Sequence, residues 1–146
     1  MPRSKTFLPD VNVWVALVFD RHVHARVASA WLDSVIDDEV VFCRVTQMGL
    51  LRLATNTRVM GADVLTQTEA WRLYRRIASD ERIRFVPEPQ EIESAWHELT
   101  TLRSFTPCLW TGAYLQAFAR QSGAQVVSFD RDISRLGGPA ALILRP

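Results

Sequence analysis

The sequence is poor in the features that mark several specialised classes of protein. Its two cysteines are too few for a disulfide framework or a zinc cluster, so we expect reduced, structural thiols. Its longest uninterrupted apolar run, Val13–Phe19, is far shorter than the roughly 18 residues of a membrane span. The amino-terminal residues show no signal-peptide pattern. We therefore expect a cytoplasmic protein with no membrane segment.

Neither sign of charge dominates the sequence. The formal net charge is +1, which argues against polynucleotide binding by the surface as a whole, so any nucleic-acid site must be local. Lys5 is the only lysine among the 17 basic residues. Arginine suits bidentate contacts with phosphate, although a GC-rich genome gives the same bias without functional meaning.

Length and periodicity predict a single α/β domain spanning residues 1–146. Short apolar runs alternate with segments of helical periodicity, which indicates a parallel sheet with right-handed crossovers. We expect Asp20 to cap the second helix and Thr46 to cap the third. The expected strands lie at 5–8, 40–43, 83–86, around 126 and at 142–144, and the expected helices at 11–19, 20–35, 46–54, 66–78, 92–99 and 110–121.

Two carboxylates follow predicted strands that are far apart in the sequence. Asp10 closes the run Phe7–Pro9, and Asp130 closes the run Val126–Phe129. In an open parallel sheet, ligands bind outside the carboxyl ends of the strands, so acids delivered there can converge on one metal ion. Carboxylate oxygens are ligands that Mg²⁺ prefers. The sequence therefore predicts metal-assisted chemistry.

Four segments spread over nearly the whole chain carry a recognisable pattern: Leu8–Trp14, Phe42–Arg52, Trp110–Leu115 and Val127–Asp132. In this order they resemble a PIN domain of the VapC toxin type. The resemblance implies a three-layer α/β/α fold with a central, mostly parallel sheet. It also implies the toxin of a type II toxin–antitoxin system: an endoribonuclease that depends on Mg²⁺ or Mn²⁺, forms a homodimer, cleaves RNA and is held inactive by a cognate antitoxin.

The same resemblance implies roles for individual residues. Asp10 matches the first metal-binding aspartate of the family and Asp130 the late one, with Asp132 as a neighbouring candidate for the metal. Asn12 and Ser128 match polar residues that support the site.

Two positions depart from the family pattern. Gly112 stands where PIN domains have a metal-binding aspartate, and glycine in the first turn of a strong helix is locally unfavourable. A close backbone approach or tolerance near the helix cap is the structural alternative. Gln47 stands where many members have a glutamate. Its amide can support the site by hydrogen bonding to a metal-bound water but brings no negative charge, and glutamine is usual in the group with a Thr-Gln-x-Gly-x-x-Arg pattern. We hypothesise that the nuclease is weakened or inactivated by Gly112, and that Gly112→Asp restores metal affinity and cleavage.

Arginines form the predicted RNA contacts. Arg72, Arg75 and Arg76 lie on one face of the helix expected at 66–78, where they either follow RNA phosphates or form an ordinary solvated face. Arg52 would contact RNA phosphate or antitoxin, or form a structural salt bridge. It lies on the helix expected at 46–54, which is apolar on more than one side and so belongs either in a subunit interface or deep in the core.

Two other functional classes compete with a nuclease. A catalytically inactive PIN-like module would bind antitoxin or RNA without cleaving. A phosphoryl-accepting receiver or phosphatase also uses an aspartate after the first strand. It fits poorly, because Lys5 lies upstream of Asp10 and Asp10-Val11-Asn12 lacks a second aspartate for the acid role.

Overall fold

The computed structural model describes residues 4–101 and 106–146. Five strands are formed: β1 (Thr6–Pro9), β2 (Glu39–Phe42), β3 (Ile83–Phe85), β4 (Gln125–Ser128) and β5 (Leu142–Ile143). Seven α-helices lie in the described parts of the chain: α1 (Val11–Val18), α2 (Ala25–Ser34), α3 (Arg44–Ala54), α4 (Thr57–Met60), α5 (Gln67–Ala78), α6 (Ile92–Thr100) and α7 (Leu109–Ser122). Two short 3-10 helices, η1 (Gly61–Asp63) and η2 (Arg131–Arg135), complete the described structure.

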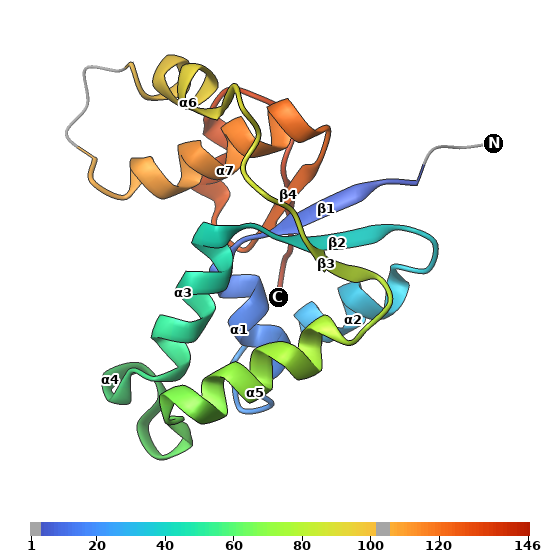
Figure 1. Ribbon diagram of the computed structural model, residues 1–146, viewed down its shortest axis with the longest axis vertical. Helices are drawn as coiled ribbons and strands as arrows, with labels where there is room; N and C mark the ends of the chain where they lie inside the picture. The colour runs from blue at the N-terminus through green and yellow to red at the C-terminus, as the bar shows by residue number, and fades with distance from the viewer. Residues whose placement is uncertain (1–3, 102–105) are drawn as a thin grey trace.

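The five strands form one sheet in the order β3-β2-β1-β4-β5, and every pairing is parallel (Figure 1). β1 lies in the centre, where Phe7 pairs with Val40 of β2 and with Gln125 of β4. The first strand is thus flanked by elements from the middle and the end of the chain. The strand predictions are confirmed, including the edge strand near the carboxyl terminus.

Helices cover both faces of the sheet, as the three-layer prediction requires. Successive strand residues point to opposite faces, so Leu8 packs in one core cluster while Phe7 packs in the other. The first cluster includes residues of α6 and α7, and the second includes residues of α1, α3 and α5. Figure 1 shows α6 and α7 on one side of the sheet and α1, α2, α3 and α5 on the other.

Two predicted helix caps are wrong. The second helix starts at Ala25, with His24 at its cap position, so Asp20 lies well before it. The third helix starts at Arg44, so Thr46 is already inside its first turn. The Thr46 hydroxyl instead accepts a hydrogen bond from the N–H of Cys43, the actual cap residue, at 3.1 Å. Thr46 thus reaches back to the cap from inside the helix, whereas we expected it to be the cap.

Helix α3 places one apolar side in the core and leaves another exposed. Leu50 is fully buried in the core, whereas the Met48 side chain is 53% exposed. Gly49 brings α3 close to α1, since a Cβ at this position would lie 2.5 Å from a Val11 side-chain carbon.

Neither cysteine forms a disulfide; Cys43 is buried and Cys108 is exposed. Within residues 4–101 and 106–146, no helix is both long enough and apolar enough to cross a membrane.

Candidate active site

Asp10 lies between β1 and α1 at the carboxyl edge of the sheet. Its backbone N–H donates to the carbonyl oxygen of Val127 on β4 at 2.7 Å. Its side chain caps α1, because Oδ1 accepts a hydrogen bond from the Val11 N–H at 2.8 Å. Oδ2 accepts a hydrogen bond from the Ser128 hydroxyl at 2.9 Å. Backbone and side-chain contacts together fix the orientation of this carboxylate.

The Ser128 hydroxyl bridges the Asp10 carboxylate and the Asp130 backbone. It is fully buried at the end of β4, donates to Asp10 and accepts a hydrogen bond from the Asp130 N–H at 3.0 Å. Asn12 makes longer contacts with the same loop: its Nδ2 lies 3.5 Å from the Ser128 Oγ, and its Oδ1 lies 3.5 Å from the Phe129 nitrogen. The structure thus brings together Asp10, Asn12, Ser128 and Asp130 from opposite ends of the sequence.

The environment makes an isolated negative charge on Asp10 unfavourable. Burial raises the pKa of its carboxyl above the ordinary value of 3.8, hydrogen bonds from Ser128 and Val11 lower it, and the nearby Asp130 raises it again. The net direction is upward. A cation next to the two acids would favour the charged form and offset their repulsion.

Asp132 contributes through its backbone. Its N–H donates to Asp130 Oδ1 at 2.9 Å, while its own carboxylate pairs with Arg135 at 3.4 Å in a largely exposed position. Across the described residues, no group of three or more histidine, cysteine or acidic side chains is arranged to hold a metal ion. The acid site is therefore built on the pair Asp10 and Asp130.

Gly112 has room for a side chain. A Cβ at this position would lie 3.4 Å from side-chain carbons of Ile133 and Leu136, which is ordinary van der Waals contact. The nearest atoms belong to side chains, so close backbone approach does not account for this glycine. Ile133 and Leu136 lie three and six residues after Asp130, so a side chain at position 112 would pack against the segment that follows the late acid.

The Gln47 side chain is directed to Arg44 and α5. Its Oε1 accepts a hydrogen bond from the Arg44 guanidinium at 2.6 Å. A second hydrogen bond, with Tyr74 on α5, partly counters the effect of burial, which raises the pKa of that phenol. Among the described hydrogen bonds, none joins Gln47 to either acid. Sequence reasoning missed Arg44, whose signal was its position immediately after a predicted strand.

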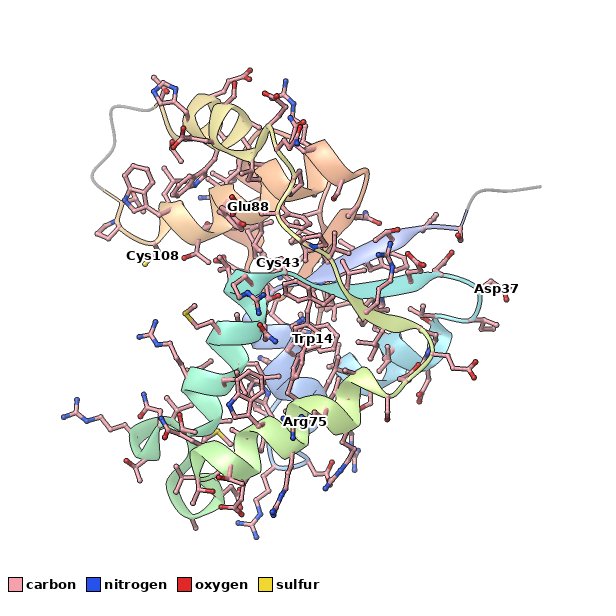
Figure 2. The ribbon with its side chains drawn as sticks, in the orientation of Figure 1. Trp14, Asp37, Cys43, Arg75, Glu88 and Cys108 are labelled. Atoms are coloured by element: carbon pink, nitrogen blue, oxygen red, sulfur yellow. The ribbon has the colours of Figure 1, made fainter. Side chains whose placement is uncertain are left out.

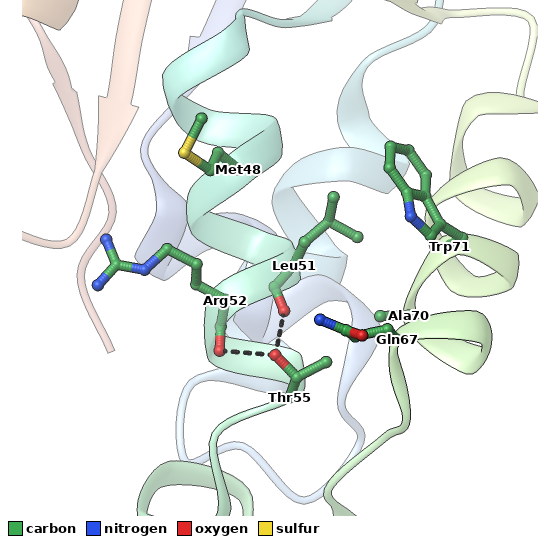
Figure 3. Close-up of a pocket in the computed structure, with 7 residues that line it drawn as sticks. All are labelled: Met48, Leu51, Arg52, Thr55, Gln67, Ala70 and Trp71. Atoms are coloured by element: carbon green, nitrogen blue, oxygen red, sulfur yellow. Dashed lines mark hydrogen bonds between the residues drawn. The ribbon is translucent and has the colours of Figure 1, made fainter.

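The four arginines predicted to contact RNA are exposed but are not joined to the acid pair. Arg52 lines a cavity of about 370 Å³ between α3 and α5 (Figure 3). Arg72, Arg75 and Arg76 are exposed on α5, which lies on the sheet face opposite α7 (Figures 1 and 2). The ion pairs found among the described residues include none of the four arginines. The alternative of a structural salt bridge at Arg52 is therefore not supported within the described part of the chain.

Comparison with known proteins identifies the family of this chain. The family model described as the PIN domain matches residues 7–139. The chain therefore belongs to the PIN-domain family. It is 41% identical over 136 residues to ribonuclease VapC41 of Mycobacterium tuberculosis, which covers 90% of this chain and 93% of that protein. Ribonuclease VapC38 of the same organism is 27% identical over 137 residues, with 88% of each chain covered. Within the PIN domains, the chain is thus a member of the VapC group of ribonuclease toxins.

Solved structures at low sequence identity support the same fold. VapBC2 from Rickettsia felis, bound to a DNA fragment from its promoter, gives a TM-score of 0.67 at 13% identity, covering 96% of this chain and 97% of that one. VapC20 of Mycobacterium tuberculosis, a toxin that cleaves the sarcin-ricin loop, gives 0.63 at 19% identity, covering 88% and 93%.

Proposed function

We propose that the chain is the toxin of a type II toxin–antitoxin system and acts in the cytoplasm as a metal-dependent endoribonuclease. The observation that carries the proposal is the buried Ser128 hydroxyl at the carboxyl edge of the sheet, which bridges the Asp10 carboxylate and the backbone N–H of Asp130. The charge of Asp130 lies close enough to raise the pKa of Asp10. That edge is where ligands bind in open parallel sheets. The identity with ribonuclease VapC41 supports RNA as the substrate.

The acid pair fits a hard divalent cation. Mg²⁺ is commonly held by one or two carboxylates, with water and substrate phosphate completing its coordination, so Asp10 and Asp130 would hold Mg²⁺ or Mn²⁺. When bound, the ion supplies an activated water and stabilises charge on the phosphate oxygens. Ser128 holds one Asp10 oxygen and the Asp130 backbone in register. The Asp132 backbone N–H donates to the Asp130 carboxylate and orients it. Asn12 contacts Ser128 and the Phe129 nitrogen, just before Asp130.

The negative charge of the site is lower than in PIN domains with acids at every family position. Gly112 brings no carboxylate, and the neutral Gln47 amide is engaged by Arg44. Fewer carboxylates attract a divalent cation less strongly. We infer that this chain is a weakened nuclease whose metal affinity rises when position 112 carries an acid.

The test compares cleavage of a mixed RNA in Mg²⁺ and in Mn²⁺ by the unaltered chain, Gly112→Asp and Gly112→Ala. Alanine is the matched control, because its Cβ fills the same space without a charge. We expect Gly112→Asp alone to raise both cleavage and the metal affinity measured by calorimetry. Asp10→Asn in the Gly112→Asp background is expected to abolish cleavage. Cleavage that survived Asp10→Asn would refute the acid pair as the reactive site.

The second candidate is a binding module that has kept the fold and lost the chemistry. Neutral residues at both Gly112 and Gln47 are the observation that favours it. This alternative predicts that the chain binds RNA or antitoxin but that neither the unaltered chain nor Gly112→Asp cleaves RNA in either metal.

The proposed protein partners are a cognate antitoxin and a second copy of the chain. The cavity between α3 and α5 carries two large exposed apolar side chains, Met48 at 53% and Trp71 at 45% (Figure 3). Exposed apolar clusters of this kind mark protein contacts. We expect a homodimer by light scattering, and dissociation to monomers in Met48→Glu. A dimer unchanged by that substitution would place the subunit contact elsewhere.

A further inference from the structure

Arg44 begins α3 at the same edge of the sheet as the acid pair. It follows Cys43, which is labelled at the end of β2 in Figure 2. β2 pairs in parallel with β1, with Phe7 opposite Val40, so Cys43 comes opposite Asp10 when the register is continued. Neighbouring strands lie about 4.8 Å apart. The start of α3 is therefore a direct neighbour of the acid site.

The Arg44 guanidinium is exposed but held in place. Its Nη1 donates to Gln47 Oε1 at 2.6 Å, and its Cζ lies 4.5 Å from the centre of the Phe85 ring at the end of β3. Both partners are neutral, and the ion pairs of the described residues do not include Arg44. The side chain is thus ordered without losing its charge, which suits bidentate binding of a phosphate.

We propose that Arg44 binds a phosphate of the RNA strand held at Asp10 and Asp130, on the β3 side of these acids. This inference rests on the proposed ribonuclease function. An RNA strand that runs from the acid pair along the carboxyl edge of the sheet toward β3 would pass the Arg44 guanidinium, which lies between Gln47 and Phe85. A phosphate of the RNA backbone at this place would match the guanidinium in charge and in geometry.

The proposal also gives Gln47 a role. A glutamate at this position would form an ion pair with Arg44 and cancel its charge. The glutamine amide holds the guanidinium through a hydrogen bond and leaves the charge available. Gln47 is then a positioning residue for phosphate binding, in place of the metal-site support predicted from the sequence.

The test is the salt dependence of RNA binding, measured by fluorescence anisotropy with a 2′-O-methyl oligoribonucleotide that resists cleavage. For single strands, the slope of log K against log salt concentration is about −0.7 per phosphate neutralised. We expect Arg44→Gln to reduce the slope by about 0.7 and to weaken binding roughly tenfold at low salt. Arg44→Lys should retain the slope, because it retains the charge.

Arg120→Gln is the matched control. It removes the same charge from an exposed arginine near the carboxyl end of α7, where the side chain pairs with Glu98 at 3.1 Å. Its slope should equal that of the unaltered chain. Equal slopes for Arg44→Gln and Arg120→Gln would overturn the proposed role of Arg44 without contradicting the proposed ribonuclease function. Failure of the unaltered chain to bind the oligonucleotide at low salt would count against the proposed function itself.

Gln47→Glu separates a positioning role from a purely structural one. We expect it to lower the slope as Arg44→Gln does, and to have no further effect when combined with Arg44→Gln. An equal additional loss in the double variant would refute the link between the two residues. Thermal unfolding of each variant establishes that the compared proteins are folded.

Discussion

Replacing Ser128 by alanine tests the link between the two acids. The change removes a hydrogen bond donated to the Asp10 carboxylate at 2.9 Å and one accepted from the Asp130 N–H at 3.0 Å, both at a fully buried oxygen. A hydrogen bond to a charged group contributes about 1.5–3 kcal/mol, and one between neutral groups about 1 kcal/mol. Because Asp130 is exposed, water can replace the Ser128 oxygen as acceptor for the Asp130 N–H. We therefore expect Ser128→Ala to lower the free energy of unfolding by about 2–3 kcal/mol at neutral pH.

The pH dependence of this loss identifies its cause. The Ser128 hydroxyl lowers the pKa of Asp10, so its bond stabilises the ionised form. Its contribution is therefore present when Asp10 is charged and is lost as the pH falls through the pKa of the folded state. Urea unfolding of the metal-free proteins should give a larger difference at pH 7.5 than at pH 4.

Ser122→Ala is the control for the Ser128 experiment. The Ser122 hydroxyl donates to the carbonyl oxygen of Phe118 at 2.7 Å at the end of α7, with no acid involved. Its effect should be small and the same at both pH values. If Ser128→Ala also cost the same at both, the hydroxyl would not be acting on the charge of Asp10, and the reasoning would fail.

Three further substitutions test the packing and the charge around the site. Gly49→Ala should lower the free energy of unfolding by about 1–3 kcal/mol, because its Cβ would lie 2.5 Å from a Val11 carbon. Gly112→Ala should instead raise the free energy of unfolding by up to about 1 kcal/mol. Equal free energies of the two variants in urea unfolding would contradict this packing. Asp10→Asn keeps the helix cap and removes a group whose raised pKa favours the folded protein at low pH and disfavours it as the pH rises. In EDTA, Asp10→Asn should raise the Tm at pH 7, with a smaller gain toward pH 4. A lower Tm at pH 7 would refute the argument that the buried charge of Asp10 destabilises the folded protein. Arg82→Ala removes donors at 2.6 and 2.7 Å to two carbonyl oxygens at the end of α2, and should cost about 2–3 kcal/mol; calorimetric melting at an unchanged temperature would contradict it.

Sequence reasoning predicted the sheet and the acid pair because both follow from local patterns. Apolar runs such as Phe7–Pro9 are buried strands in any arrangement of the surrounding helices, and an aspartate after a central parallel strand must lie at its carboxyl edge. The strand order, and with it the adjacency of Asp10 and Ser128, comes from pairings across the whole chain. The sequence suggested it only through the family resemblance.

The local errors have a physical origin. Asp20 and Thr46 are good capping residues, yet the helices begin where packing fixes them, at Ala25 and Arg44. The short helices α4, η1 and η2 carry too few residues to show a period. The contact between Arg44 and Gln47 depends on side-chain conformations that residue spacing does not determine.

The hydrogen bond between Ser128 and Asp10 spans 118 positions in the sequence. A growing chain on the ribosome that has not yet exposed β4 can form β1 and β2 but has neither the hydroxyl nor the second acid. A contact between residues this far apart also carries a cost in loop-closure entropy, which slows its formation. A nuclease whose site closes only with its final strands would threaten the RNA of its own polysome only after synthesis is almost finished.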